Sequence, residues 1–457
     1  MAALRKVTAL ALAAMLAGCA LDAPPSASDL QKSVLPQGPV PAAFRAGAGV
    51  AAPVQERWLA AFGDPTLNAL VDEALRFNAD LQVAAARVEQ AGAYVRVAHG
   101  ALLPQVGVVG LGGGKSGGGG GLDGIFLNAS LELDVWGRLR YGEAAAQAQA
   151  DAATADYAYA RQSIAATVAK AWFLAIEAGL QRGITQDALT SSGTLQRLAQ
   201  DRLRIGNGNA QALAQARVNV GTYADLLRQV DLAREQSVRA LELLLGRYPA
   251  AELAVATQLA SMPPPVPVGT PSQLLERRPD VVAAERRVAA AFDRVGEAKA
   301  ARLPRISLTA GGSNVSSDLI VLKNANDPIW SVGANLIAPL YQGGALQAQV
   351  EIRTAEQKQA VADYARTGQR AFGEVESALS AEAALRERDT ILASTVRDSQ
   401  EALSLAQTQY RIGSADLRAV EQSQLSLYSL RTARLRVQTE QLAQRANLHL
   451  ALGGDFE

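Results

Sequence analysis

The sequence predicts a membrane protein of the α+β class, in which duplicated units, each a strand hairpin with a long helix, assemble as a homotrimer. Three observations support this fold class. The 457-residue chain repeats itself after about 200 residues, each half carries two strand-like segments, and each half contains a helical pattern of about 68 residues.

The duplication covers most of the chain. Residues 78–104 return 200 positions later as 278–304, and both copies end in Ala-x-Leu-Pro. The sequence Leu-Arg-Ile-Gly at 203–206 returns as Tyr-Arg-Ile-Gly at 410–413. A period of this length exceeds that of a solenoid repeat. We therefore expect the two halves to build the same structure beside each other.

The N-terminus has the features of an export signal. Arg5 and Lys6 precede a short apolar stretch, Val7 to Leu16, which is too short to cross a bilayer. It ends in Leu-Ala-Gly followed by Cys19, an arrangement that resembles the bacterial lipobox. We predict a lipoprotein signal peptide at 1–18 and a covalent lipid on Cys19. The alternative is an ordinary signal peptide with an incidental cysteine.

The rest of the chain divides into an arm, two repeats and a linker. An extended N-terminal arm is expected at 19–62, and a Pro-rich linker at 261–271 separates the repeats. The first repeat, 63–260, has a helix at 66–103, strands at about 105–137 and a long helix at about 138–205. The second repeat, 272–457, has a helix at 272–303, strands at about 305–343 and a long helix at about 344–412.

Composition argues against an enzyme. The chain has 44 basic and 44 acidic residues, so it shows no preference for nucleic acid, and it has two His and one Cys. The run from Gly110 to Ser116 lacks the spacing of a phosphate-binding loop. We expect no catalytic residues, no metal and no cofactor apart from the lipid on Cys19.

The lengths of the elements predict how the chain assembles. A helix of about 68 residues spans roughly 100 Å at ~1.5 Å per residue, and two shorter helices in sequence match it. After the signal, the chain has no run of 18 apolar residues, so a β-barrel would have to cross the membrane. Four strands are too few, because bacterial membrane barrels need about 8. Three copies would supply 3 × 4 strands, about 12. A two-stranded coiled coil is the alternative for the long helices.

Several motifs resemble one family, the outer-membrane factor lipoproteins in the NodT branch of the TolC-like efflux proteins. The resemblance covers about residues 55–454, and it rests on the motifs Phe62-Gly63-Asp64-Pro65, Leu274 to Val281, Leu131 to Arg138, Pro339 to Gly344 and Ala451 to Gly454. It implies a homotrimeric channel in which a 12-stranded outer-membrane β-barrel continues into a periplasmic α-helical barrel.

The resemblance also implies partners and a function. It predicts a passive exit duct for drugs or other small solutes, joined by a periplasmic adaptor (membrane fusion) protein to an inner-membrane transporter of the RND type. The lipid of the outer membrane would be a further partner. The alternatives are the exit duct of a type I protein secretion system, or a lipid-anchored helical scaffold or enzyme that forms no channel.

Two sets of candidate site residues lie where the long helices end. We expect the adaptor to dock on two tip turns, Arg204, Ile205, Gly206 and Arg411, Ile412, Gly413. The alternative is that each glycine only ends its helix. Related channels often carry acidic gate residues after the second turn, and the matching positions here are Ala419 and Gln422. The charged candidates nearby, and Gln422 itself, form the predicted periplasmic gate: Asp416, Arg418, Glu421 and Gln422.

Overall fold

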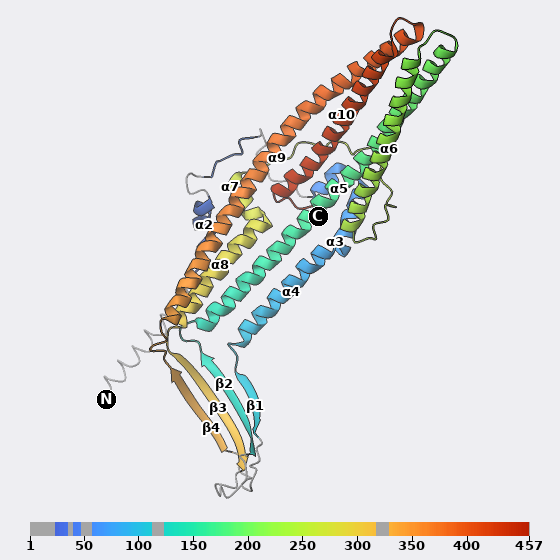
Figure 1. Cartoon of the computed structure of the whole chain (residues 1–457). Helices are drawn as coiled ribbons and strands as arrows, with labels where there is room; N and C mark the ends of the chain where they lie inside the picture. The colour runs from blue at the N-terminus through green and yellow to red at the C-terminus, as the bar shows by residue number, and fades with distance from the viewer. Residues whose placement is uncertain (1–22, 35–39, 47–56, 112–122, 317–328, 457) are drawn as a thin grey trace. The chain divides into compact units, whose positions relative to one another are not determined.

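A computed structural model describes residues 23–34, 40–46, 57–111, 123–316 and 329–456 (Figure 1). The signal peptide, Cys19 and most of the Gly-rich run lie outside the described residues. The elements are α2 Ala27–Val34, a 3-10 helix η1 Trp58–Phe62, α3 Pro65–Phe77, α4 Ala79–Gly100, β1 Gln105–Leu111, β2 Asp123–Leu133, α5 Arg138–Arg204, α6 Ala210–Leu244, α7 Pro271–Arg277, α8 Pro279–Ala300, β3 Arg305–Ser316, β4 Ile329–Ile337, α9 Ala345–Ile412 and α10 Leu417–Ala451.

The chain divides into two compact units that cut across the sequence repeats. The first unit comprises 1–39, 85–156 and 280–368, and the second comprises 40–84, 157–279 and 369–457. Each repeat contributes to both units, because its helices run from one into the other. The division into arm, two repeats and linker therefore stays a prediction from the sequence.

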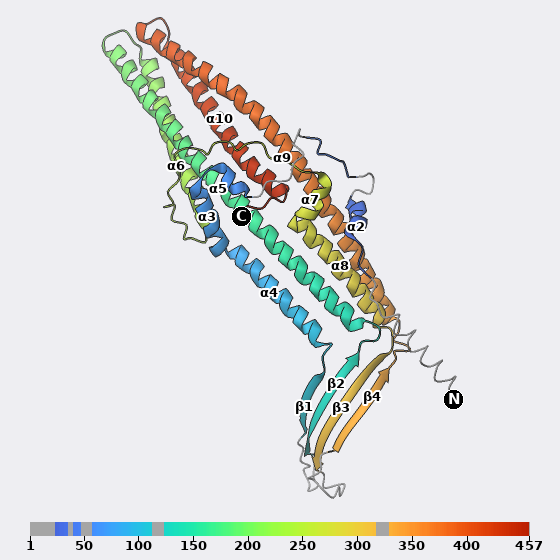
Figure 2. The ribbon, with the colours of Figure 1, turned by 180° about the vertical axis from the view of Figure 1, so that it is seen from behind.

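The first unit contains an antiparallel sheet of four strands in the order β1-β2-β3-β4 (Figures 1 and 2). The hairpin β1–β2 comes from the first repeat and β3–β4 from the second. They join through β2 and β3, which pair from Asp123 opposite Ser316 to Leu133 opposite Ile306. The outer edges of β1 and β4 have no neighbouring strand among the described residues.

The sheet has one apolar and one polar face, because successive side chains of a strand point to opposite sides. Trp330 and Val332 on the apolar face are 72% and 89% exposed. The register places on that face Val106, Val108, Ile125, Leu127, Leu308, Trp330, Val332 and Leu336. It places on the other face Gln105, Asn128, Ser130, Glu132, Arg305, Ser307, Thr309, Ser331 and Asn335. The apolar residues Val109, Phe126 and Ile337 share this mainly polar face. An exposed apolar face opposite a polar one is the pattern of strands that separate lipid from water.

The connection from β2 to α5 is held by side chains at the base of the sheet. The Asp134 carboxylate accepts the N–H groups of Leu139 (3.0 Å) and Arg140 (2.9 Å), which lack partners in the first turn of α5. The indole N–H of Trp136 donates to the Pro304 carbonyl at 2.7 Å, just before β3. The two repeats are therefore tied together where strands become helices.

The second unit is built around an apolar core. Its centre contains Trp58, Leu67, Trp172, Phe173 and Ile176, all nearly inaccessible to solvent. Within the described residues, α5 is the one helix long and apolar enough to cross a membrane by length and composition. That test is also met by core helices, and α5 contributes many residues to this core.

The motif Gly63-Asp64-Pro65 starts the helix that covers this core. Gly63 ends η1 at φ 62°, and Asp64 caps α3 by accepting the N–H groups of Thr66 (2.9 Å) and Leu67 (3.1 Å). Pro65 occupies the first helical position, where its missing N–H costs nothing. The same Asp64 accepts the indole N–H of Trp172 at 2.7 Å, so the cap also fixes α5.

Two helices that the sequence predicts as continuous are each broken. The helix expected at 66–103 restarts after Asn78, whose side chain accepts the N–H groups of Asp80 (3.0 Å) and Leu81 (3.2 Å). The helix expected at 272–303 restarts at Pro279, which has no N–H to continue α7.

Each break is held by an equivalent contact, in which a side chain at the break donates to a carbonyl at the end of a later helix. The Asn78 amide donates to the Leu244 carbonyl (2.9 Å) at the end of α6. Arg278 donates to the Ala451 carbonyl (3.2 Å) at the end of α10. The next turns need glycine, since a Cβ on Gly246 would lie 2.6 Å from the Phe77 carbonyl oxygen. Gly453 approaches the chain at 277–278 in the corresponding way.

Buried arginines hold the second repeat. Arg278 is fully buried and binds Glu374 at 2.6 Å. Arg445 is 1% exposed, binds Glu382 at 2.7 Å and donates to the Pro263 carbonyl at 2.8 Å. Arg445 thus joins α9, α10 and the linker.

The described parts of the N-terminal arm contain helices that the sequence does not predict. Instead of an extended chain over 19–62, the arm contains α2 and η1. Ser26 accepts the N–H of Asp29 (3.3 Å) at the start of α2, and Leu30 and Val34 bury one face of the helix. The backbone N–H groups of Arg45 and Ala46 donate to the Glu376 carboxylate at 2.9 and 2.7 Å, which fixes the arm on α9.

The buried carboxyl of Asp293 in α8 should make the stability of the first unit depend on pH. Burial raises the pKa of its carboxyl from 3.8 to about 6. Because the folded pKa exceeds the unfolded one, this carboxyl lowers stability as pH rises from about 4 through 6, and the cost is complete above the folded pKa.

We expect Asp293→Asn to stabilise the protein by on the order of 2–3 kcal/mol at pH 8 and not at pH 4. The measurement is the melting temperature in detergent, monitored by circular dichroism at both pH values. Asp398→Asn on the exposed surface of α9 is the control. An equal gain at both pH values would show that the carboxyl is not responsible.

Candidate functional site

The two predicted tip turns have the same backbone structure. Gly206 (φ 80°) and Gly413 (φ 87°) adopt the left-handed conformation that ends α5 and α9. The next N–H closes each turn, from Asn207 to the Arg202 carbonyl (2.9 Å) and from Ser414 to the Gln409 carbonyl (2.9 Å). This is the usual six-to-one closure of a helix ended by glycine. The helix-ending role of both glycines is thus explained by backbone geometry alone.

The return helices also begin alike. Asn209 caps α6 by accepting the N–H of Ala212 at 2.6 Å, and Asp416 caps α10 by accepting that of Ala419 at 3.1 Å. Figure 2 shows both turns at the same end of the second unit.

The remaining tip residues are exposed. The side chains of Ile205 and Ile412 are 66% and 73% exposed, an uncommon position for isoleucine at a helix end. Arg204 forms an ion pair of 2.9 Å with Asp201 on its own helix, and Arg411 lies in solvent. The tips therefore present a matched pair of apolar and cationic side chains.

Arg202, which the sequence does not single out, joins the two tips. It donates to the carbonyl of Tyr410 and to that of Arg411 (3.3 Å), at the end of α9. Its guanidinium also lies 4.3 Å from the centre of the Tyr410 ring. One arginine of the first hairpin thus binds terminal carbonyls of the second, in addition to the Gly413 N–H, which donates to the Tyr410 carbonyl at 3.1 Å.

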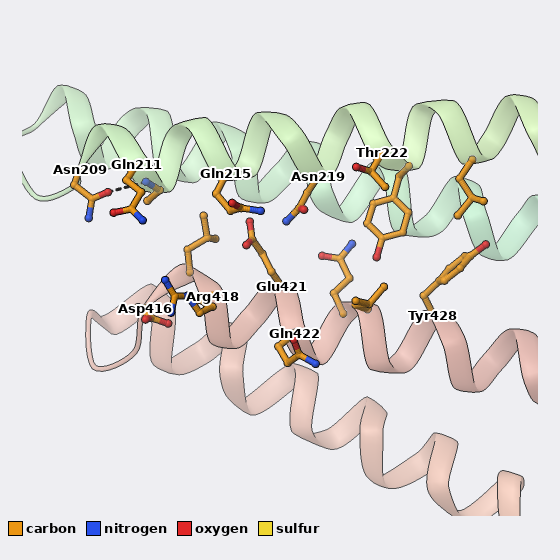
Figure 3. A pocket seen from close by; sticks show the side chains of 16 residues that line it. Asn209, Gln211, Gln215, Asn219, Thr222, Asp416, Arg418, Glu421, Gln422 and Tyr428 are labelled. Carbon is orange, nitrogen blue, oxygen red and sulfur yellow. Dashed lines mark hydrogen bonds between the residues drawn. The ribbon is translucent and has the colours of Figure 1, made fainter.

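A polar groove of about 540 Å³ separates α6 from α10 behind the tips (Figure 3). It is rich in amide side chains, which include Asn209, Gln211, Gln215, Asn219, Gln422 and Gln424. The groove adjoins an apolar core shared by both hairpins, to which Leu417 of the groove also belongs. The core further contains Leu213, Ala216, Val420 and Leu427. This core holds the walls of the groove together.

The four predicted gate residues all line this groove, because they occupy the first turns of α10. Asp416 is the helix cap, while Arg418 and Gln422 are exposed. Glu421 points toward Asn219 of α6 (Figure 3). Within the described part of this chain, Arg418 has no carboxylate within ion-pair distance. The structure thus brings the candidates together without pairing them in one protomer.

Glu421 has the most unusual environment of the four. Burial raises the pKa of its carboxyl, and a hydrogen bond from Asn219 and the charge of Arg418 offset part of this effect. Its Oε1 atom is buried without a hydrogen-bond partner. A buried carboxylate oxygen without a hydrogen bond lowers the stability of the fold unless a further donor reaches it.

The sequence also does not reveal Gln424. Its buried amide donates to the Ala188 carbonyl (2.8 Å) and to the Ser192 hydroxyl (3.0 Å) of α5. These partners are more than 230 positions away, so no local pattern announces them. Among the described residues, no three His, Cys, Asp or Glu side chains are grouped to hold a metal.

A family model described as "Outer membrane efflux protein" matches residues 70–247 and 270–454. The chain is 33% identical over 415 residues to the cation efflux system protein CusC of Escherichia coli O6:H1, with 88% of each chain covered. It is 31% identical over 421 residues to the pyoverdine export outer membrane protein OpmQ of Pseudomonas putida, with the same coverage.

Solved structures of outer-membrane channels share the fold. The channel OprN superposes with a TM-score of 0.81 at 26% identity, covering 92% of this chain and 98% of OprN. This likeness confirms the predicted fold class, long helices joined to a four-stranded sheet, and the relatives favour an efflux duct over a secretion duct or a scaffold. The chain belongs to the outer membrane efflux protein family and is an outer-membrane exit channel of an efflux system, extending into the periplasm.

Proposed function

We propose that three copies of this chain close a 12-stranded barrel in the outer membrane and form the passive exit duct of a tripartite pump for drugs or other small solutes. The observation that carries the assembly is the sheet. One chain supplies four strands, an exposed apolar face and, among the described residues, two unpaired edges. In lipid each unpaired backbone group costs several kcal/mol, so the edges must find partners.

Aromatic side chains support this orientation of the sheet. Trp330 lies near the loop end of β4, while Trp136 and Tyr341 lie near the helical end and are exposed. Membrane barrels carry such aromatic residues at both interfaces of an apolar belt. The polar face of the sheet then lines the duct.

Purified protein in mild detergent should cross-link to three copies and no further, and it should conduct ions in a planar bilayer. Val332→Asp on the apolar face should reduce membrane insertion, since a charged side chain on the lipid-facing side of a barrel strand is destabilising. Thr309→Asp on the polar face is the matched control and should insert normally. A folded monomer, or a ladder that continues past three, would contradict the assembly.

We also propose that Cys19 carries the lipid and becomes the first residue of the mature protein. The support is the lipobox-like sequence in front of it. The mass of the purified protein should include acyl chains that Cys19→Ala removes.

The tips are proposed to dock a periplasmic adaptor, which links the duct to an inner-membrane transporter of the RND type. In support, Arg204, Ile205 and Gly206 recur as Arg411, Ile412 and Gly413 with the same geometry. A partner that covers the exposed side chains of Ile205 and Ile412 would remove apolar surface from water, which favours binding.

Ile412→Asp should abolish efflux in cells while conductance and trimer yield stay normal, because it removes apolar contact without changing the glycine turn. Ile391→Asp, 56% exposed at a distance from the tip on the same helix, should leave efflux intact. Resistance to pump substrates and co-purification with the adaptor are the measurements. Full efflux in Ile412→Asp would exclude docking through this side chain.

The groove behind the tips is proposed as the periplasmic gate. Arg418 lacks a carboxylate partner within the described part of its own chain, while Glu421 and Asp416 stand beside it. Neighbouring protomers can therefore exchange ion pairs across the closed end, and three symmetric copies would hold it shut until the adaptor binds.

Arg418→Glu should raise the single-channel conductance of the isolated trimer several-fold, because it turns attraction between protomers into repulsion. The difference should shrink in high salt, which screens exposed charges. Arg217→Glu, on the exposed face of α6 outside the groove, is the control. Wild-type conductance of Arg418→Glu in low and high salt alike would show that closure is steric.

A further inference from the structure

The charged residues on the polar face of the sheet are not balanced. Arg305 is the first residue of β3, and it alternates with Ile306 and Leu308 of the apolar face. It shares its face with Ser307 and Thr309 and is exposed. Its guanidinium thus lies on the side that faces the duct, at the end of the sheet where strands meet helices.

Among the described side chains of the four strands, the other charged one is Glu132, and it is neutralised. Glu132 forms a two-pronged bond with Arg138, at 3.1 and 2.8 Å, and both side chains are 22% exposed. Asp134 binds Arg140 at 3.2 Å. Arg305 makes no ion pair within the described part of the chain. Among the described side chains of the strands, Arg305 is therefore the charged residue that has no ion-pair partner.

We propose that Arg305 is a specificity-determining residue of the duct, which favours anionic solutes and binds multivalent anions at the base of the barrel. This rests on the proposed trimer, in which three Arg305 side chains form a ring. The wall around the ring is lipid-facing and of low dielectric, so it concentrates the field in the lumen. Rings of Arg or Lys are the usual means by which pores select anions.

Block of the channel by a multivalent anion tests the ring independently of the tips. Ferrocyanide, added to each side of a bilayer holding the purified trimer, should block the wild-type channel, more strongly in low salt than in high salt. In Arg305→Gln the half-blocking concentration should rise roughly fivefold or more. Arg305→Lys should retain the block. Arg302→Gln removes the same charge just before β3, outside the strand register, and should behave as wild type.

A second variant tests the ring even if Arg305→Gln does not assemble. Thr309→Arg adds a charge on the same face of β3 and should strengthen the block. Wild-type channels that conduct but ignore ferrocyanide would overturn the ring alone, as would a block that survives Arg305→Gln or weakens equally in Arg302→Gln. Absence of any conductance in the wild type would instead overturn the proposed function.

Discussion

The rest of the structure depends on the need of every backbone N–H and C=O group in lipid for a hydrogen-bond partner. A sheet of four strands cannot meet that need, because β1 and β4 each have one edge that no other strand of the described residues covers. The sheet of a single chain therefore cannot form a closed barrel. In the proposed trimer, further copies pair with both open edges, the apolar face meets lipid and the polar face lines the lumen.

Backbone groups at helix ends also need hydrogen-bond partners, and this need explains how the segments of the second unit are joined. Helices end in carbonyls that have no partner within the helix, and several of those ends are buried here. Asn78 satisfies the end of α6, Arg278 that of α10, and Arg202 that of α9. Each of these side chains comes from a distant segment, so closing a helix also fastens two parts of the unit together.

Much of the fold can be predicted because its signals are local or repeated. The duplication, the alternating strands and the ends of α5 and α9 at a glycine are all visible directly in the sequence. The break at Pro279 has a signal in the sequence, because a proline inside a helical pattern ends or kinks the helix. The break at Asn78 is harder to predict, because it depends on capping by the Asn78 side chain. The order in the arm escapes prediction because its anchors, such as Glu376, lie more than 300 positions away.

In the candidate site, too, some features can be predicted from local sequence and others depend on distant contacts. The tip glycines are evident from their sequence, and the gate candidates are found because they come directly after the turn. The direction of Glu421, the contact of Arg202 with Tyr410 and the amides of the groove depend on how two hairpins pack, and no single segment contains that information. The sequence identifies the residues at the tip, but their contacts are known only from how the hairpins pack.

The two tips are alike in backbone but differ in the three residues after the glycine. The first tip continues as Asn207-Gly208-Asn209 and the second as Ser414-Ala415-Asp416, so one is neutral and the other ends in a carboxylate. A trimer would therefore display two chemical classes of tip in alternation around its rim. A partner that contacts only the shared Arg-Ile-Gly would saturate the rim at twice the stoichiometry of one that requires the carboxylate. In the proposed pump, the ratio of adaptor to channel subunits would thus depend on whether the adaptor distinguishes Asn209 from Asp416.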